Sequence, residues 1–128
     1  MSESERDVQV RIDLLGPLRL TVDGQAVEVP GPRRQAVLAL LAMAQGRVVS
    51  TDELLDAVWP NEMPDSGRRA LHSHVSRLRR HLGPAGPRLE RAGTGYRLGL
   101  SADELDVAQV RRIAAGGHHE VDDLAAAL

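Results

Sequence analysis

The chain of 128 residues contains no cysteine, no phenylalanine and no lysine. Without cysteine there is no disulfide framework, no thiol nucleophile and no cysteine-ligated zinc site. A single tryptophan and a single tyrosine leave few rings on which unpaired bases could stack, which argues against a single-strand binder. Because 42% of the residues are hydrophobic, a core is available, and it must consist of leucine, valine, alanine and isoleucine.

Long apolar runs are also missing, and none approaches the roughly 20 residues that span a bilayer. The opening residues, MSESERD, are polar and acidic, unlike a secretory signal peptide, and residues 1–7 are expected to be disordered. These features predict a cytoplasmic protein. The length suits one ordinary domain followed by a further segment.

The formal net charge of −2 is unevenly distributed along the chain. Residues 66–97 hold eight arginines and one acid, Glu90, for a net charge of +7, and the remainder carries −9. A GC-rich genome, which favours arginine codons, explains the absence of lysine but not this clustering. Because phosphate responds to the local field, a basic segment of this kind can bind DNA despite the negative total.

Residues 66–82 show the spacing of an amphipathic helix. One face holds Leu71, Val75, Leu78 and Leu82, and the opposite face holds arginines and serines without any acid. An α-helix fits the major groove of duplex DNA, where arginine can donate twice to guanine. The candidate base-reading residues are Ser73, Ser76, Arg77 and Arg80. Arg79 lies nearer the apolar face, where an ion pair with the preceding helix, a backbone contact and a base contact all stay open.

The other elements surround this helix in a recognisable order. Alternating residues predict strands within 8–15, 18–22 and 26–29, the last two joined by an Asp23-Gly24 hairpin. Helices are expected at 33–44 and 51–58, with Ser50 and Glu53 as a capping box, and Ser66 is expected to cap the third helix. Two short strands at 88–91 and 96–98 follow. Together they predict an α+β winged helix-turn-helix with an N-terminal antiparallel sheet, three helices and a C-terminal β-hairpin wing.

Residues 101–128 have a different pattern, and the winged domain is therefore expected to span 8–100. A helix is predicted from Ala102 to Ala115, broken by Gly116-Gly117, and a second helical pattern begins at Glu120. Two short helices make an incomplete bundle. They either pack on the winged domain or begin a further all-α domain, and the second interpretation is favoured.

Three motifs resemble the OmpR/PhoB type of winged-helix DNA-binding domain: Leu54-Leu-Asp-Ala-Val-Trp59, His74-Val-Ser-Arg-Leu-Arg-Arg80 and Gly93-Thr-Gly-Tyr-Arg97. The match runs from about Val8 to Leu100. Within this type, Leu14-Leu-Gly-Pro-Leu18 and the stretch from Pro32 to Leu41 are similar to the Streptomyces antibiotic regulatory protein (SARP) family.

The resemblance implies a transcription activator that binds direct repeats in promoters as side-by-side protomers and recruits RNA polymerase holoenzyme. Residues 101–128 then resemble the opening of a bacterial transcriptional activation domain. The family's DNA-contacting positions on the third helix match Arg69, Ser73, Ser76 and Arg77, with Arg80 close by. Ala92 stands where the wider type has a minor-groove arginine, which leaves Arg91 to contact phosphate. The candidate phosphate or positioning contacts are Trp59, Arg69, His74, Arg91, Thr94 and Arg97.

Other chemistry has little support in the residues. His72, His74 and His81 lack metal-ligand spacing, so no metal is expected, and His74 is interpreted as packed or next to phosphate. No activated nucleophile can be assembled, so neither an enzyme nor a cofactor is predicted. Trp59 is expected to fill the core between the second helix and the sheet. The alternative function is a winged-helix interaction module that contacts polymerase or a regulator without specific DNA binding.

Overall fold

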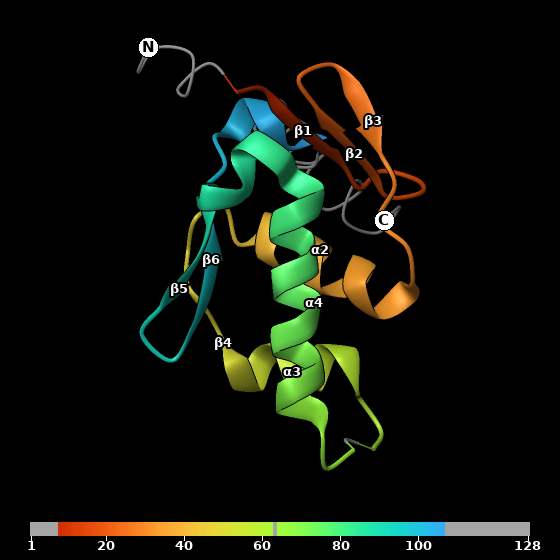
Figure 1. Cartoon of the computed structure of the whole chain (residues 1–128), viewed down its shortest axis with the longest axis vertical. Helices are drawn as coiled ribbons and strands as arrows, with labels where there is room; N and C mark the ends of the chain where they lie inside the picture. Colours follow the sequence, from red (N-terminus) through yellow and green to blue (C-terminus); the bar gives the residue numbers. More distant parts are fainter. Residues whose placement is uncertain (1–7, 63, 107–128) are drawn as a thin grey trace, which may run out of the picture.

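A three-stranded antiparallel sheet opens the structure, a computed structural model that describes residues 8–62 and 64–106 (Figure 1). Its strands are β1 (Val10–Asp13), β2 (Arg19–Val22) and β3 (Gln25–Val27), with β2 in the centre. Asp23 and Gly24 join β2 to β3 with φ angles of 49° and 81°, the positive values that a tight hairpin turn requires. The sequence therefore predicted this hairpin correctly. Residues 1–7 lie outside the described part.

Three helices follow the sheet: α2 (Pro32–Met43), α3 (Thr51–Val58) and α4 (Gly67–Leu82). The Ser50 hydroxyl accepts a hydrogen bond from the Glu53 N–H at 3.1 Å, which confirms Ser50 as the cap of α3. The expected capping box is only half formed, because the Glu53 carboxylate accepts from the Ser50 hydroxyl, at 3.4 Å, and not from the Ser50 N–H. Ser66 occupies the N-cap position of α4, but its side chain makes no capping hydrogen bond, so that expectation was wrong. The Ser66 backbone, with φ −87° and ψ 12°, is not in the extended conformation typical of a capping residue.

A second small sheet carries the wing. After a 3₁₀ turn, η1 (Gly83–Arg88), the hairpin strands β5 (Leu89–Ala92) and β6 (Gly95–Leu98) pair, and β6 also pairs with β4 (Val49–Ser50). Gly95 lies opposite Ser50, where a Cβ atom would stand 2.0 Å from the Val49 carbonyl oxygen. This close approach fixes the wing to the strand before α3, and it was not apparent from the sequence.

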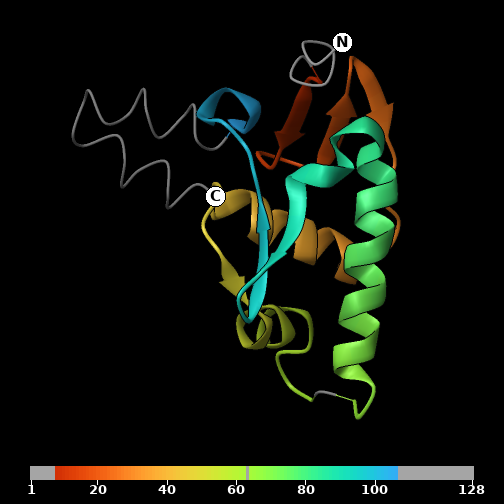
Figure 2. The ribbon, with the colours of Figure 1, turned by 60° about the vertical axis from the view of Figure 1, so that its left-hand side comes forward.

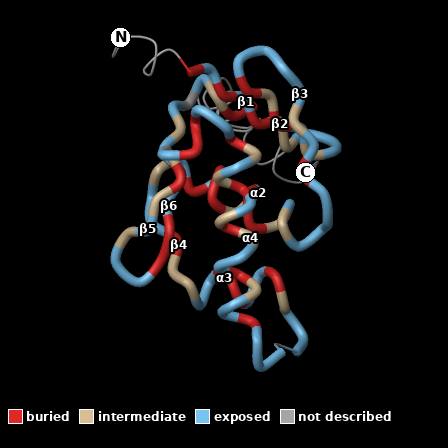
Figure 3. Tube along the Cα trace, in the orientation of Figure 1, coloured by how far each residue is buried: buried red, intermediate tan, exposed pale blue. Residues whose placement is uncertain are grey.

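The core lies where the two sheets meet the three helices, while the wing tip and residues 60–62 and 64–66 after α3 are exposed (Figure 3). Aliphatic side chains from every layer are fully buried in it, among them Ile12, Leu38, Leu54, Leu78 and Leu98. Burial of such a side chain stabilises the fold by roughly 1.5–3 kcal/mol. The structure thus confirms the predicted α+β winged-helix class and its aliphatic core.

The residues after the wing pack on β1. The predicted α-helix does not begin at Ala102: a short 3₁₀ helix, η2 (Ala102–Glu104), is followed by Leu105, which forms a parallel bridge with Ile12 and is fully buried. The Asp106 carboxylate accepts hydrogen bonds from the N–H groups of Leu14 and Leu15. The rest of the predicted helical segment lies outside the described residues, and the domain boundary at residue 100 stays a prediction.

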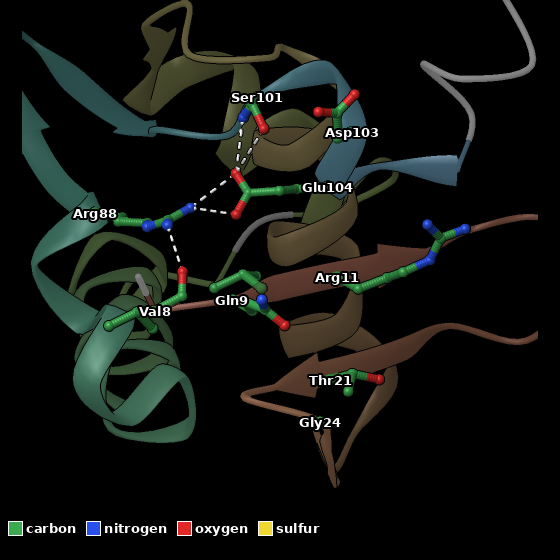
Figure 4. Close-up of a pocket in the computed structure, with 10 residues that line it drawn as sticks. Val8, Gln9, Arg11, Thr21, Gly24, Arg88, Ser101, Asp103 and Glu104 are labelled. Atoms are coloured by element: carbon green, nitrogen blue, oxygen red, sulfur yellow. Dashed lines mark hydrogen bonds and ion pairs between the residues drawn. The ribbon is translucent and has the colours of Figure 1, made fainter. Parts of the chain in front are cut away.

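Arg88 ties this segment to the start of β1 beside a pocket on the N-terminal sheet (Figure 4). Its guanidinium donates to both Glu104 carboxylate oxygens, at 2.8 and 2.7 Å, and to the Val8 carbonyl oxygen at 2.7 Å. Burial acts to raise the pKa of Glu104, but the bonds from Ser101 and Arg88 outweigh it and hold that pKa below its ordinary value. Figure 1 places η2 at one end of the molecule and the N-terminus of α4 at the other.

Candidate nucleic-acid interface

Helix α4 runs along one edge of the molecule, with α2 and the wing on its inner side (Figure 2). Its buried residues are Gly67, Leu71, Val75, Leu78 and Leu82, which include all four positions of the predicted apolar face. The helix is therefore anchored along one side, and its opposite side faces solvent. No acidic residue lies anywhere in α4.

The predicted base-reading residues lie on or beside this outer side. Ser73, Arg77 and Arg80 are exposed, whereas Ser76 is half-buried. Arg69, in the first turn, is exposed as well. The side chains of Arg69, Arg77 and Arg80 take part in no ion pair or hydrogen bond with another described residue. Their donors are therefore available to an external acceptor.

Arg79 is engaged within the protein through a backbone contact. Its Nε donates a 2.8 Å hydrogen bond to the carbonyl oxygen of Leu89, the first residue of the wing strand β5. It pairs with no described acid of α3, because the one ion pair recorded between the two helices joins Arg68 to Asp52. Arg79 thus fixes the base of the wing against α4.

The wing residues differ in how far they are already engaged. Arg97 pairs with Glu90 across the hairpin, so its guanidinium has a partner within the protein. Arg91 is exposed and its guanidinium carbon lies 6.0 Å from the centre of the Tyr96 ring, a cation–π arrangement. Thr94 is exposed, and its carbonyl oxygen accepts bonds from the N–H and the hydroxyl of Thr51 at 3.1 and 2.7 Å.

These contacts bring the wing tip close to the start of α3 and the first turn of α4. Thr51, Arg68, Arg91 and Thr94 line one shared hollow there. Within it, Arg91 is the arginine without a carboxylate partner among the described residues, because Arg68 pairs with Asp52 at 3.2 Å. The hollow shows that wing and helix form one continuous surface.

Trp59 ends α3 as its C-cap residue; it packs against the core as expected but is only half-buried, so it does not fill the core. The guanidinium carbon of Arg33, in the first turn of α2, lies 5.6 Å from the centre of its ring. With Ser66 and Ala70 at the start of α4, Trp59 and Arg33 line a surface hollow. The ring thus lies beside the starts of α2 and α4.

His74 lies on the side of α4 that faces the start of α2, and it is half-buried. Burial lowers its pKa, and the positive charges of Arg34, Arg77 and Arg33 lower it further. The pKa of His81 is lowered by burial and by Arg34, whose Nη1 lies 3.4 Å from the His81 Nε2. The neutral form of both rings is therefore favoured near pH 7.

Arg33 and Arg34 are the members of this surface that sequence reasoning missed. Helix 33–44 was expected to be largely buried, which holds for Val37, Leu38, Leu41 and Ala42 but not for its first turn. Two adjacent arginines at a helix start were the available signal. Which helix they would face depends on how α2 crosses α4, and no local pattern encodes that crossing.

Within residues 8–62 and 64–106, no group of three histidine, aspartate or glutamate side chains could hold a metal ion. In that same part of the chain, no helix has the length and apolar character needed to cross a membrane.

Comparison with known proteins identifies the domain type. The family model described as "Transcriptional regulatory protein, C terminal" matches residues 24–98, which run from the β2–β3 turn to the end of the wing. The chain belongs to this family. The match includes α3, α4 and both wing strands, so the three motifs that suggested an OmpR/PhoB-type domain lie inside it.

Several similar proteins are transcriptional regulators of the SARP type. The chain is 42% identical over 118 residues to the transcriptional regulatory protein EmbR of Mycobacterium tuberculosis, a match that covers 87% of this chain and 30% of the relative. It is 34% identical over 114 residues to the regulatory protein AfsR of Streptomyces coelicolor, covering 89% of this chain and 11% of AfsR. The chain thus spans less than a third of the length of either relative.

A solved structure supports the same assignment. Mycobacterium tuberculosis EmbR, in complex with a low affinity phosphopeptide, superposes with a TM-score of 0.80 and 36% sequence identity. The superposition covers 88% of this chain and 31% of that one. The family and this neighbour together establish a winged-helix domain of the DNA-binding, transcription-regulating type.

Proposed function

We propose that this domain reads the major groove of duplex DNA with the outer face of α4 and that it belongs to a transcription activator. The observation that carries the proposal is a helix fixed by its apolar side, on which the exposed side chains of Arg69, Arg77 and Arg80 have no partner in the described residues. Arg77 and Arg80 have the fork geometry that donates twice to guanine. A bidentate contact of this kind discriminates by roughly 1–3 kcal/mol.

Positioning is assigned to residues around the base-reading face. Arg69 in the first turn, Arg91 beside the wing tip and Trp59 at the end of α3 are proposed to contact phosphates, which set register without carrying sequence information. The engaged Arg97 is expected to add less, because its guanidinium already pairs with Glu90. Thr94 is proposed to act mainly through its backbone, which holds the wing against α3.

The larger assembly is also part of the proposal. Relatives of this type are regulators, and we propose that protomers bind side by side on direct repeats in promoters and recruit RNA polymerase. Footprinting of the chain on genomic fragments tests the repeat arrangement, because protected segments should recur in the same orientation at a constant spacing. Single isolated footprints would contradict side-by-side binding. Binding to RNA polymerase with no duplex affinity would favour the interaction-module alternative.

Substitutions separate reading from positioning. Arg77→Ala should relax the base preference at one position of the site, whereas Arg69→Ala should weaken binding to all sequences alike. Arg19→Ala is the matched control, because Arg19 is an exposed arginine on β2 of the N-terminal sheet. Selection of bound duplexes from a random pool measures the preference. If Arg77→Ala and Arg69→Ala both behave like Arg19→Ala, α4 is not the reading helix.

A further inference from the structure

Five cationic or titratable side chains gather where the start of α2 meets α4. We name Arg33, Arg34, His74, Arg77 and His81 the α2–α4 cluster. The Arg34 Nη1 lies 3.4 Å from the His81 Nε2, and the positive charges of Arg33, Arg34 and Arg77 all act on His74. Arg33 is further held by its stacking over the Trp59 ring. Only Arg77 and His74 of this cluster were anticipated as DNA contacts.

The cluster lacks a counter-charge in the described part of the protein. The four ion pairs in the described part of the chain involve Arg11, Arg68, Arg88 and Arg97, and none of these arginines belongs to the cluster. The first turn of α2 contains no acid either. Moreover, the Arg34 Nε and the His74 Nδ1 are buried without any hydrogen-bond partner.

This arrangement is unfavourable in the free domain. A histidine responds to burial and neighbouring positive charge by losing its proton, but an arginine guanidinium stays charged at any relevant pH. Arg34 therefore keeps its charge in a half-buried position next to other cations, with one donor unsatisfied. Unpaired buried donors and charges destabilise a fold, and such local conflicts are expected at functional sites.

We propose that the α2–α4 cluster binds a backbone phosphate of the DNA, with Arg33 and Arg34 as the donors. This inference rests on the proposed function. Arg77 belongs both to the cluster and to the exposed side of α4, so a strand lying along α4 passes next to the start of α2. A phosphate there supplies the negative charge that the described residues do not, and it extends the contact surface from α4 to a second helix.

Salt titration of binding to a short random-sequence duplex tests the proposal. The slope of log affinity against log salt changes by about 0.9 for each phosphate neutralised, so Arg34→Gln should make the slope shallower by about one unit and lower the affinity about tenfold. Arg33→Gln, at an exposed position, should also make the slope shallower and lower the affinity. Arg19→Gln on the N-terminal sheet is the matched control and should leave the slope unchanged.

Thermal unfolding of the same variants separates this role from a structural one. Because Arg34→Gln removes an unpaired charge, the free domain should keep or raise its Tm while it loses DNA affinity. A slope that stays at the wild-type value in both Arg33→Gln and Arg34→Gln would overturn the proposal. A wild-type chain with no salt-dependent duplex binding would overturn the proposed function itself, and this inference with it.

Discussion

Removal of the Arg88 side chain should destabilise the domain far more than removal of a surface arginine. Arg88 donates to both carboxylate oxygens of Glu104 and to the Val8 carbonyl oxygen. The side chain of Arg88 is 27% exposed and that of Glu104 is 15% exposed. Arg88→Ala would leave the Glu104 carboxylate largely shielded from water with the bonds from Ser101 but without its charged partner. Breaking a fully buried pair costs about 3–5 kcal/mol, and the partial exposure here reduces the expected loss to about 2–3 kcal/mol.

Thermal unfolding followed by circular dichroism measures this loss. A destabilisation of about 1 kcal/mol lowers the Tm of a domain of this size by about 4–8 °C, so Arg88→Ala should lower it by about 10–20 °C. Arg11→Ala is the matched control, because Arg11 pairs with Asp13 on the exposed side of β1 and should lose only about 0–1 kcal/mol. Equal Tm shifts for the two variants would refute the reasoning.

Three further outcomes follow from the same structure. Gly95→Ala should destabilise the domain in urea unfolding by several kcal/mol, because the added Cβ would stand 2.0 Å from the Val49 carbonyl oxygen. Gly99→Ala is the control and should change the stability little, because its Cβ would stand 3.9 Å from its nearest neighbour, the Arg88 carbonyl oxygen. Ser50→Ala should lower the free energy of unfolding by about 1 kcal/mol in the same assay, because it removes the cap of α3. Ser73→Ala, at an exposed position of α4, is the control, and an equally small loss of stability in the two variants would contradict the cap. Stability should fall as the pH drops below 6.5, because the lowered pKa of His74 makes the unfolded chain take up the proton first, and His74→Gln should flatten this fall.

Local patterns in the sequence were sufficient for much of this fold. The alternation in β1 and β2, the Asp23-Gly24 turn and the capping of α3 by Ser50, three residues before Glu53, all depend on neighbours close in the chain. The same holds for the buried positions of α4, because helical periodicity assigns them to one side. Each of these predictions is confirmed.

What the sequence did not predict depends on contacts between distant segments. The pairing of Val49 with Tyr96, the bridge from Ile12 to Leu105 and the bond from Arg79 to Leu89 have no signal in local spacing. The partial exposure of Trp59 beside Arg33 was missed for the same reason, since its environment depends on how α2 lies against α3 and α4. The candidate DNA contacts on α4 were predictable as an exposed face, whereas Arg33 and Arg34 join them only through the tertiary fold.

Mapping of duplex binding by amide chemical shifts tests the central claim most directly. On titration with a duplex selected by the wild-type chain, the largest changes should fall on residues 69–80 of α4, with smaller changes at Arg91, Thr94 and the start of α2. The strands β1 to β3 should stay nearly unchanged. Shift changes concentrated on that sheet, with α4 unaffected, would contradict the assignment of α4 as the DNA-reading helix.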